Sequence, residues 1–594
     1  MTASLVFPPA LIFVCGALLV TVLRGRTLKG VALAVPLACL VTLWLAPEGS
    51  FGHFSLIGLD LVLTRIDPLS RIFGYIFCLA SLLGTIFSFH HTDRSHYAVA
   101  LLYAGAAVGV TFAGDLFTLF LFWEALTIAA TFLIIARRTR QAREAAMRYL
   151  LVHVAGGLCL LTGIILHFSA SGSLAFTALK LGEPGALLIF LGFGLNCAWP
   201  LLHGWLVDAY PEASVSGAVL LSAFTTKSAV YVLARAFAGT ESLIWIGTVM
   251  AAFPVFYALM ENDLRRVLSC SLISQVGYMV VGIGIGTEMA LNGAVCHAYA
   301  HILYKSLLFM AMGAVLYRTG KSKVTDLGGL YRSMPWTMIF CLVGGAAISA
   351  FPLFSGFITK SMIMDATAHS QLQFVWLVLQ AASAGTFIYA GIKVPYRTFF
   401  GRDAGLRPQE APRHMLLAMG GTAAMCIFLG VYPDFLYGIM PYPGTYHAYG
   451  AAHVLSKLQL LGFAGLGFFL LLRWGLYPFE SRSINLDVDW IYRKGAGLVY
   501  TLADRVFNGL NTLGDRIFVR KLPELLARFF AEPGGNLQLG GVRLMARMTG
   551  NGSAKADLEN HILQRSRLGT YPAGVGVLLA VFFLAVMSLL FFVG

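Results

Sequence analysis

Charged residues are scarce in this sequence. Asp, Glu, Lys and Arg make up 12% of its 594 residues, and hydrophobic residues make up 58%. Soluble domains carry about 25% charged residues, so the composition excludes an ordinary soluble fold and predicts an all-α polytopic membrane protein. The net charge of +14 comes from basic residues in loops between apolar segments. That placement fits orientation in a membrane better than binding to nucleic acid.

The sequence also lacks the motifs that hold common redox and metal cofactors. It has no GxGxxG at a strand–helix junction, no HExxH and no CxxC. Its nine cysteines are scattered, mostly within apolar segments, where cysteine packs as a small hydrophobic residue. We therefore expect no cofactor, no metal and no redox chemistry in this chain, although it could be the ion-pumping subunit of an enzyme complex.

Long apolar segments fill most of the chain. A membrane span needs about 20 predominantly apolar residues. The first segment has no charged leader, so we expect a retained helix rather than a cleaved signal peptide. In total the sequence predicts sixteen spans, near residues 5–24, 29–46, 72–90, 95–113, 115–136, 146–168, 186–206, 213–238, 242–260, 266–286, 291–317, 336–366, 373–399, 413–437, 455–475 and 573–593.

Basic residues are distributed unequally between the alternate loops of this arrangement. One side receives clusters such as 137–148 and 318–332, and the other receives little beyond Arg65, Arg71 and Lys180. The positive-inside rule places the basic side in the cytoplasm and both termini on the opposite face. Residues 476–572 are too polar to span and contain amphipathic stretches. They predict cytoplasmic-side helices, which form either a surface-bound linker or a lateral brace against neighbouring subunits.

Two predicted spans contain internal breaks, at Pro200 and Pro352. Irregular backbone at membrane depth occurs only inside protein or beside a water-filled cavity. In each half of the chain a broken span is followed by a lysine-bearing one, with Lys227 in the first half and Lys393 in the second. Five spans separate the two breaks, and an odd number reverses orientation. The sequence therefore predicts inverted repeats, a common plan of transporters.

Titratable residues inside apolar spans are functional candidates, because burying charge in a membrane is costly. Glu124 and Lys227 both lie well inside spans. We expect them to form a proton-carrying pair, the alternative being a structural salt bridge. Lys360 follows the second break, and Lys393 is nearer the cytoplasmic end of its span, where it could snorkel to the surface.

His297, His301 and Lys305 recur every four residues and therefore share one helix face. Histidine titrates near neutral pH, so this row is expected to line a proton channel. A zinc site at the two histidines lacks further ligands in the sequence. The alternative is that each histidine is a structural residue, hydrogen-bonded within a packed core.

The motifs DLFTLFLFWE, PLLHGWLVDA, ENDLRRVLSCSLISQVGY, HAYAHILYKSLLF and FPLFSGFITK together resemble those of the antiporter-like proton-conducting subunits. This family is shared by respiratory complex I, membrane-bound hydrogenases and multisubunit (Mrp-type) cation/proton antiporters. The resemblance covers about residues 60–440. It implies fourteen helices with two inverted five-helix half-channels, extended in some members by a lateral helix and a final span. It also implies a proton path through Glu124, Lys227, His297, His301, Lys305 and Lys360.

The resemblance gives the predicted organisation of the chain. It comprises N-terminal spans (1–94), a first half-channel (95–241), a second half-channel (242–400), peripheral spans (401–475), lateral helices (476–572) and a final span (573–594).

The sequence departs from the family pattern at three places. Asn196, seven residues before His203, stands where relatives have a lysine, and Val207 replaces a proline. The segment before the eighth helix, which usually contains a proline, reads SVSGAVLL here. Asparagine can hold water but cannot carry a proton as lysine can. We keep Asn196, His203, Asp208 and Lys393 as secondary site candidates.

The predicted function is that of a proton-translocating subunit in a multisubunit complex of the bacterial inner membrane, with other integral membrane subunits, lipid, protons and sodium as partners. A cation/proton antiporter with this chain as its D-type subunit is favoured. The alternatives are a pumping subunit of a complex I-like oxidoreductase or membrane-bound hydrogenase, and a largely structural subunit with a degenerate channel.

Overall fold

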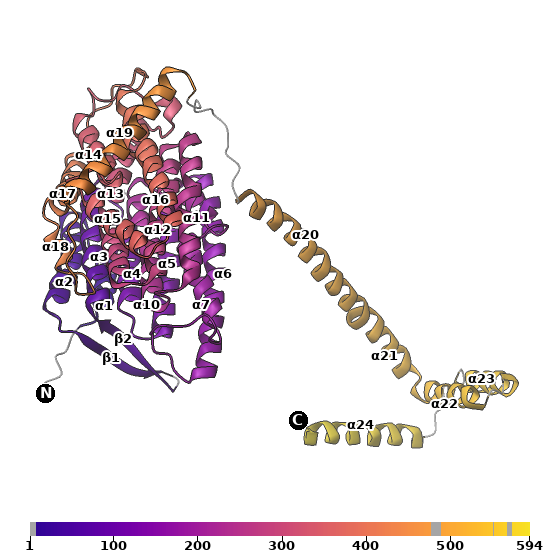
Figure 1. Cartoon of the computed structure of the whole chain (residues 1–594). Coiled ribbons are helices and arrows are strands. Elements are labelled where there is room, and N and C mark those ends of the chain that lie inside the picture. The colour runs from indigo at the N-terminus through magenta and orange to yellow at the C-terminus, as the bar shows by residue number, and fades with distance from the viewer. Residues whose placement is uncertain (1–6, 57, 477–488, 550–551, 567–572, 594) are drawn as a thin grey trace. The chain divides into compact units, whose positions relative to one another are not determined.

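The computed structural model describes residues 7–56, 58–476, 489–549, 552–566 and 573–593. The chain divides into two compact units, Met1–Asp489 and Trp490–Gly594. In the first unit the helices lie side by side as a bundle, with a short β-hairpin at one end (Figure 1). Helices predominate in both units, as the sequence predicts.

Twelve helices in the described part of the chain are long and apolar enough to cross a membrane. Each corresponds to one of the predicted spans, which confirms a multi-pass membrane protein. They are α2 (Gly25–Leu45), α3 with the 3-10 turn η1 (Pro68–Phe87, Ser88–His90), α4 (Arg94–Phe112), α5 (Leu116–Ile135), α6 (Arg140–Ser171), α9 with α10 (Val215–Ala223, Thr225–Ala236), α11 (Glu241–Met260), α12 (Leu264–Ile285), α13 (Glu288–Thr319), α16 with the π-helices η3 and η4 (Gln373–Thr386, Phe387–Lys393, Tyr396–Phe400), α17 (Arg413–Val431) and α19 (Ala451–Arg473).

The other four predicted spans correspond to shorter apolar helices: α1 (Pro9–Val22), α7 (Ala186–Asn196), α14 (Pro335–Ile348) and the segment Gly576–Ser588 of α24 (Ala573–Val593). Helices α7 and α14 are short because the chain breaks after each, before α8 (Gly204–Ala209) and α15 (Ser355–His369). Two further short elements are η2 (Val324–Asp326) and α18 (Asp434–Tyr437). The total of sixteen spans therefore stays a prediction.

One element was not predicted. Strands β1 (Gly49–Leu56) and β2 (Leu59–Ile66) form an antiparallel hairpin between α2 and α3, in register Gly49 opposite Ile66. The expectation of an all-α chain is thus wrong for this loop. The hairpin is held to the bundle because the Val62 N–H donates to Asp115 Oδ2 at 2.8 Å and the Gly114 N–H donates to the Val62 carbonyl at 3.0 Å. These long-range contacts are invisible in the local sequence.

The two breaks share one backbone conformation. At the first, Ala198 and Leu201 have φ of 60° and 70°; at the second, Ala350 and Leu353 have φ of 57° and 73°. The local sequences are Ala-Trp-Pro-Leu and Ala-Phe-Pro-Leu. A left-handed conformation costs a non-glycine residue about 1–2 kcal/mol, so its recurrence at matching positions marks the breaks as equivalent local structures.

Helix α13 forms the core of the first unit. It packs against α3, α9, α12, α14, α15 and α17. In its most apolar 18-residue window, 94% of the residues are buried. A polar side chain on α13 therefore meets protein on every side, which makes the His297–Lys305 row an interior feature.

The second unit is a chain of helices. It contains α20 (Asp489–Gly514), the π-helix η5 (Asp515–Lys521), α21 (Leu522–Ala531), α22 (Pro533–Thr549), α23 (Gly552–Ser566) and α24. Its α20–α21 stretch is helical throughout, as predicted for the amphipathic segment. Residues 477–488, 550–551 and 567–572 of the predicted lateral segment lie outside the described residues.

Candidate functional site

The first unit encloses six of the titratable side chains that the sequence singled out. Burying an ammonium or imidazole without partners is costly, so the groups that each nitrogen contacts indicate its role. These six side chains are each at most 1% exposed: Lys227, His297, His301, Lys305, Lys360 and Lys393.

Lys227 is positioned by an interruption within its own span. Helix α9 ends at Ala223 and α10 begins at Thr225, so the carbonyls at the end of α9 lose their helical partners. The Lys227 Nζ donates to one of them, the Ser222 carbonyl, at 2.7 Å and to Thr226 Oγ1 at 3.1 Å. The interruption thus supplies the acceptor that the buried ammonium needs.

Lys360 has the same relation to the second break. It lies on α15, just after the break, and its Nζ donates to the carbonyl of Ile348, the last residue of α14, at 3.2 Å. The Nζ also lies 4.8 Å from the ring centre of Tyr278, where a cation is attracted by the aromatic face. In both cases, the helix that ends just before the lysine leaves a carbonyl free to accept from its ammonium. This helix is α9 for Lys227 and α14 for Lys360.

The row on α13 lies in the core, and α13 packs against both α10 and α15, the helices that carry these lysines. His297 Nδ1 is 2.9 Å from Thr359 Oγ1, and Lys305 Nζ donates to Ser271 Oγ at 2.6 Å. His301 has no hydrogen-bond partner at either ring nitrogen among the described residues. The ring centres of His297 and His301 are 6.3 Å apart. A buried imidazole with both nitrogens open can take a water at each, which suits a proton-transfer position.

Glu124 does not pair with Lys227. It is half-buried on α5 against α6, where a Cβ on Gly157 would lie 1.8 Å from Glu124 Oε1. Neither residue has an ion pair in the described structure, and the Lys227 ammonium is directed to its own helix interruption instead. The expectation of a direct Glu124–Lys227 pair is therefore wrong, although both residues stay candidates for a proton path.

Asn196, which replaces the family lysine, is fully buried at the end of α7. Neither its Oδ1 nor its Nδ2 has a hydrogen-bond partner among the described residues. Buried amides are nearly always satisfied by protein or by ordered water. The position thus fits the predicted role of holding water without carrying charge.

Three other secondary candidates have structural contacts. Arg148 of α6 binds Asp208 of α8 in a two-pronged salt bridge, with N–O distances of 2.6 and 3.0 Å. His203 is buried with its ring centre 4.6 Å from that of Phe253. Lys393 does not snorkel to the surface; its buried Nζ donates to carbonyls at the end of α11, those of Leu259 at 2.7 Å and Glu261 at 2.9 Å. These contacts hold helices together.

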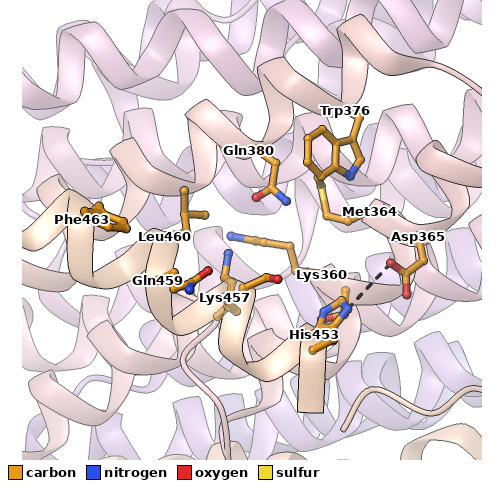
Figure 2. A pocket seen from close by; sticks show the side chains of 14 residues that line it. Lys360, Met364, Asp365, Trp376, Gln380, His453, Lys457, Gln459, Leu460 and Phe463 are labelled. Carbon is orange, nitrogen blue, oxygen red and sulfur yellow. Dashed lines mark hydrogen bonds and ion pairs between the residues drawn. The ribbon is translucent and has the colours of Figure 1, made fainter. Parts of the chain in front are cut away.

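A cavity beside Lys360, lined by both polar and apolar side chains, was not predicted from the sequence. Its volume is about 660 Å³, and it is lined by residues of α15, α16 and α19 that include Asp365, His453 and Lys457 (Figure 2). The sequence contains a signal, because Lys457 falls inside the predicted span 455–475 and His453 lies four residues before it. The described residues contain no group of three or more His, Cys, Asp or Glu that could hold a metal ion.

Residues 113–386 match the protein family described as NADH:quinone oxidoreductase/Mrp antiporter, TM. This range contains all six residues that the sequence analysis placed in the proton path. Lys393 and the cavity residues on α19 lie beyond it.

Two curated relatives represent different complexes. Hydrogenase-4 component B of Escherichia coli (strain K12) is 26% identical over 469 residues, which cover 68% of this chain and 70% of that protein. The A-type subunit of the Na(+)/H(+) antiporter of Bacillus subtilis (strain 168) is 29% identical over 455 residues, or 66% of this chain and 57% of that protein. The chain thus spans little more than half the length of this antiporter relative, which is of the A type, whereas the sequence analysis favoured the D type.

The fold is also that of a solved structure. A chain of the Mrp complex from Dietzia sp. DQ12-45-1b superposes with a TM-score of 0.73 at 24% identity, covering 90% of this chain and 62% of that one. Residues 113–386, somewhat less than half of the chain, thus match the membrane-subunit family of NADH:quinone oxidoreductases and Mrp antiporters.

Proposed function

We propose that this chain translocates protons as an antiporter-like subunit of a multisubunit membrane complex, through Glu124, Lys227, His297, His301, Lys305 and Lys360. The observation that carries the proposal is the set of lysine and histidine side chains buried inside the first unit. The charges of Lys227, Lys305 and Lys360 all act on His301, so each of these lysines lies within electrostatic range of that imidazole. Protonation of one group therefore changes the free energy of protonating the next.

The proposed architecture has sixteen spans and two inverted half-channels, one in residues 95–241 and one in residues 242–400. The matching conformation of the two breaks supports this repeat. We place the basic loops and residues 476–572 on the cytoplasmic side and both termini on the other, because positively charged loops stay in the cytoplasm. The second unit is proposed as a lateral brace against neighbouring subunits.

The complex proposed is a cation/proton antiporter, with sodium as the exchanged cation. Relatives named as Na(+)/H(+) antiporter subunits support this assignment. The alternative is the proton-pumping subunit of a hydrogenase-like or complex I-like enzyme. This alternative is favoured because the match covers 70% of the hydrogenase relative but 57% of the Bacillus subtilis antiporter subunit. A structural subunit with a degenerate channel is the remaining alternative, which Asn196 favours. Identification of the subunits that co-purify in mild detergent distinguishes the two complexes.

Replacing Lys227 with alanine tests the proton path. The substitution removes the side-chain ammonium at the α9–α10 interruption, so we expect proton flux in vesicles containing the purified complex to fall at least tenfold. A pH-sensitive dye inside the vesicles measures the flux. Lys180→Ala, which removes an exposed loop lysine, serves as the control and should leave flux unchanged. Full flux in Lys227→Ala with an intact complex contradicts the proposed function.

A further inference from the structure

The cavity beside Lys360 connects a buried group with the outer surface of the first unit. Lys360 is 1% exposed, but it forms part of the cavity wall together with α19 residues on the surface of the unit, such as Phe463, which is 73% exposed. Polar Ser456 and Gln459 are exposed there as well. Polar surface in a span is costly against lipid, so this side of the cavity fits contact with water.

A second lysine faces Lys360 across the cavity. The amino groups of Lys360 and Lys457 point toward one another in Figure 2, and the charge of Lys457 acts on Lys360. Lys457 comes from α19 and donates to Ser383 Oγ of α16 at 2.7 Å. A lysine ammonium has three N–H groups. Among the described residues, Ser383 is the acceptor that Lys457 reaches. Its other positions are free for water.

The remaining polar wall carries one carboxylate and one histidine. Asp365 accepts a hydrogen bond from the Tyr446 hydroxyl at 2.6 Å and lies 3.9 Å from His453 Nδ1. His453 Nε2 is 2.8 Å from Ser361 Oγ. Two lysines against one carboxylate make the cavity positive when the lysines are protonated. Such a site repels metal cations, whereas an amine can accept a proton and release it.

We propose that this cavity is the outlet of the proton path, in which Lys457 relays protons from Lys360 to the surface while sodium is excluded. The inference rests on the proposed function and adds a residue and a direction of exit to it. In the transfer, an N–H bond of the Lys360 ammonium breaks, directly or through water, and an N–H bond forms on the Lys457 amine. Lys457 then releases its proton to water on the surface side, so no other reactant is required.

Three variants test the outlet. Lys457→Gln removes the group that carries the proton. Lys457→Arg keeps the charge and can still donate to Ser383, but a guanidinium does not release its proton in proteins. Ser383→Ala removes only the hydrogen-bond acceptor. We expect proton flux to fall at least tenfold in both lysine variants and to change less than twofold in Ser383→Ala, all measured on the intact complex in vesicles.

A merely structural Lys457 predicts a different pattern, in which Lys457→Arg retains flux because it keeps charge and hydrogen bonding. That result would contradict the proposal that Lys457 relays protons through this cavity. Full flux in Lys457→Gln would contradict it as well. Lys227→Ala measured in the same vesicles separates the two proposals: if it abolishes flux while the Lys457 variants do not, the outlet is wrong and the proton path stands. Full flux in all of them contradicts the proposed function as well.

Discussion

The buried lysines differ in how many acceptors surround them. Lys360 donates to one carbonyl and Lys227 to one carbonyl and one hydroxyl, each supplied where a helix is interrupted. Lys393 donates to three carbonyls at the end of α11, which engage all of its N–H groups. Removing a proton from Lys393 would break a complete set of hydrogen bonds. Lys393 is therefore better suited to holding α11 and η3 together than to passing protons.

Asp67, at the beginning of α3, contributes to stability in a way that depends on pH. Burial raises the pKa of this carboxyl, but the hydrogen bond and charge of Arg235, together with the Ser70 N–H and the charge of Arg65, outweigh burial and hold the pKa below its ordinary value. Arg235 donates to Asp67 Oδ1 at 2.7 Å and joins α10 to α3. A carboxyl with a lowered pKa stabilises the folded state above its ordinary pKa of about 3.9 and loses that contribution as the pH falls.

The variant Asp67→Asn should therefore lower the stability of the detergent-solubilised protein at pH 7, by about 2 kcal/mol for a hydrogen bond between charged groups. The difference from the native protein should begin to shrink below about pH 4, where the unfolded chain takes up a proton at Asp67, and should vanish once the folded protein is protonated there as well. Thermal unfolding from pH 7 to pH 3 measures both effects. Asp60→Asn, at an exposed position of the β-hairpin that precedes α3, is the control. A difference independent of pH would contradict this role for the ion pair.

At the scale of elements, interrupted helices supply the acceptors for two buried lysines. The second break frees the Ile348 carbonyl, which accepts from Lys360, whereas the carbonyl that accepts from Lys227 is freed by the α9–α10 interruption. Each of the two breaks also stops a helix inside the first unit. The left-handed residues that make the break possible are alanine and leucine rather than glycine. The strain is therefore part of the native fold and is offset by packing of the helices on either side.

Leu353 allows this strain to be measured, because its side chain is 56% exposed and contributes little to the core. Its φ of 73° is tolerated by glycine but strongly disfavoured for a β-branched residue. We expect Leu353→Val to destabilise the protein by about 1–2 kcal/mol relative to Leu353→Gly. Apparent melting temperatures of the two variants in detergent provide the comparison. Equal melting temperatures of the two variants would show that the left-handed backbone at Leu353 does not destabilise a β-branched residue there.

At the scale of the whole molecule, every titratable residue that is buried in the described part of the chain belongs to the first unit. Helix α19 is part of this unit, because Lys457 bonds to Ser383 and His453 to Ser361. A deletion of residues 477–594 leaves all of these contacts in place. We expect the shortened protein to retain the melting temperature of the native bundle within a few degrees.

A deletion that also removes α19, from residue 451 onward, is the matched comparison and should destabilise the bundle, since it exposes Lys360 and the cavity wall. Thermal unfolding in detergent tests both deletions. Loss of folding in the shorter deletion would contradict the independence of the first unit. Co-purification of partner subunits with the shorter deletion, measured in the same preparation, tests whether residues 477–594 brace neighbouring subunits.

The sequence by itself determined the membrane class, the twelve long spans, the positions of both breaks and the residues that lie buried along the proposed path. It could do so because hydrophobic length, proline and isolated charges are local properties of the chain. Only the tertiary structure decided which buried charges meet. It separated Glu124 from Lys227, engaged Lys393 with the end of α11 and brought Lys457 to Lys360, 97 positions earlier in the sequence. Those outcomes depend on helix packing and on the carbonyls that broken helices expose, neither of which a local pattern encodes.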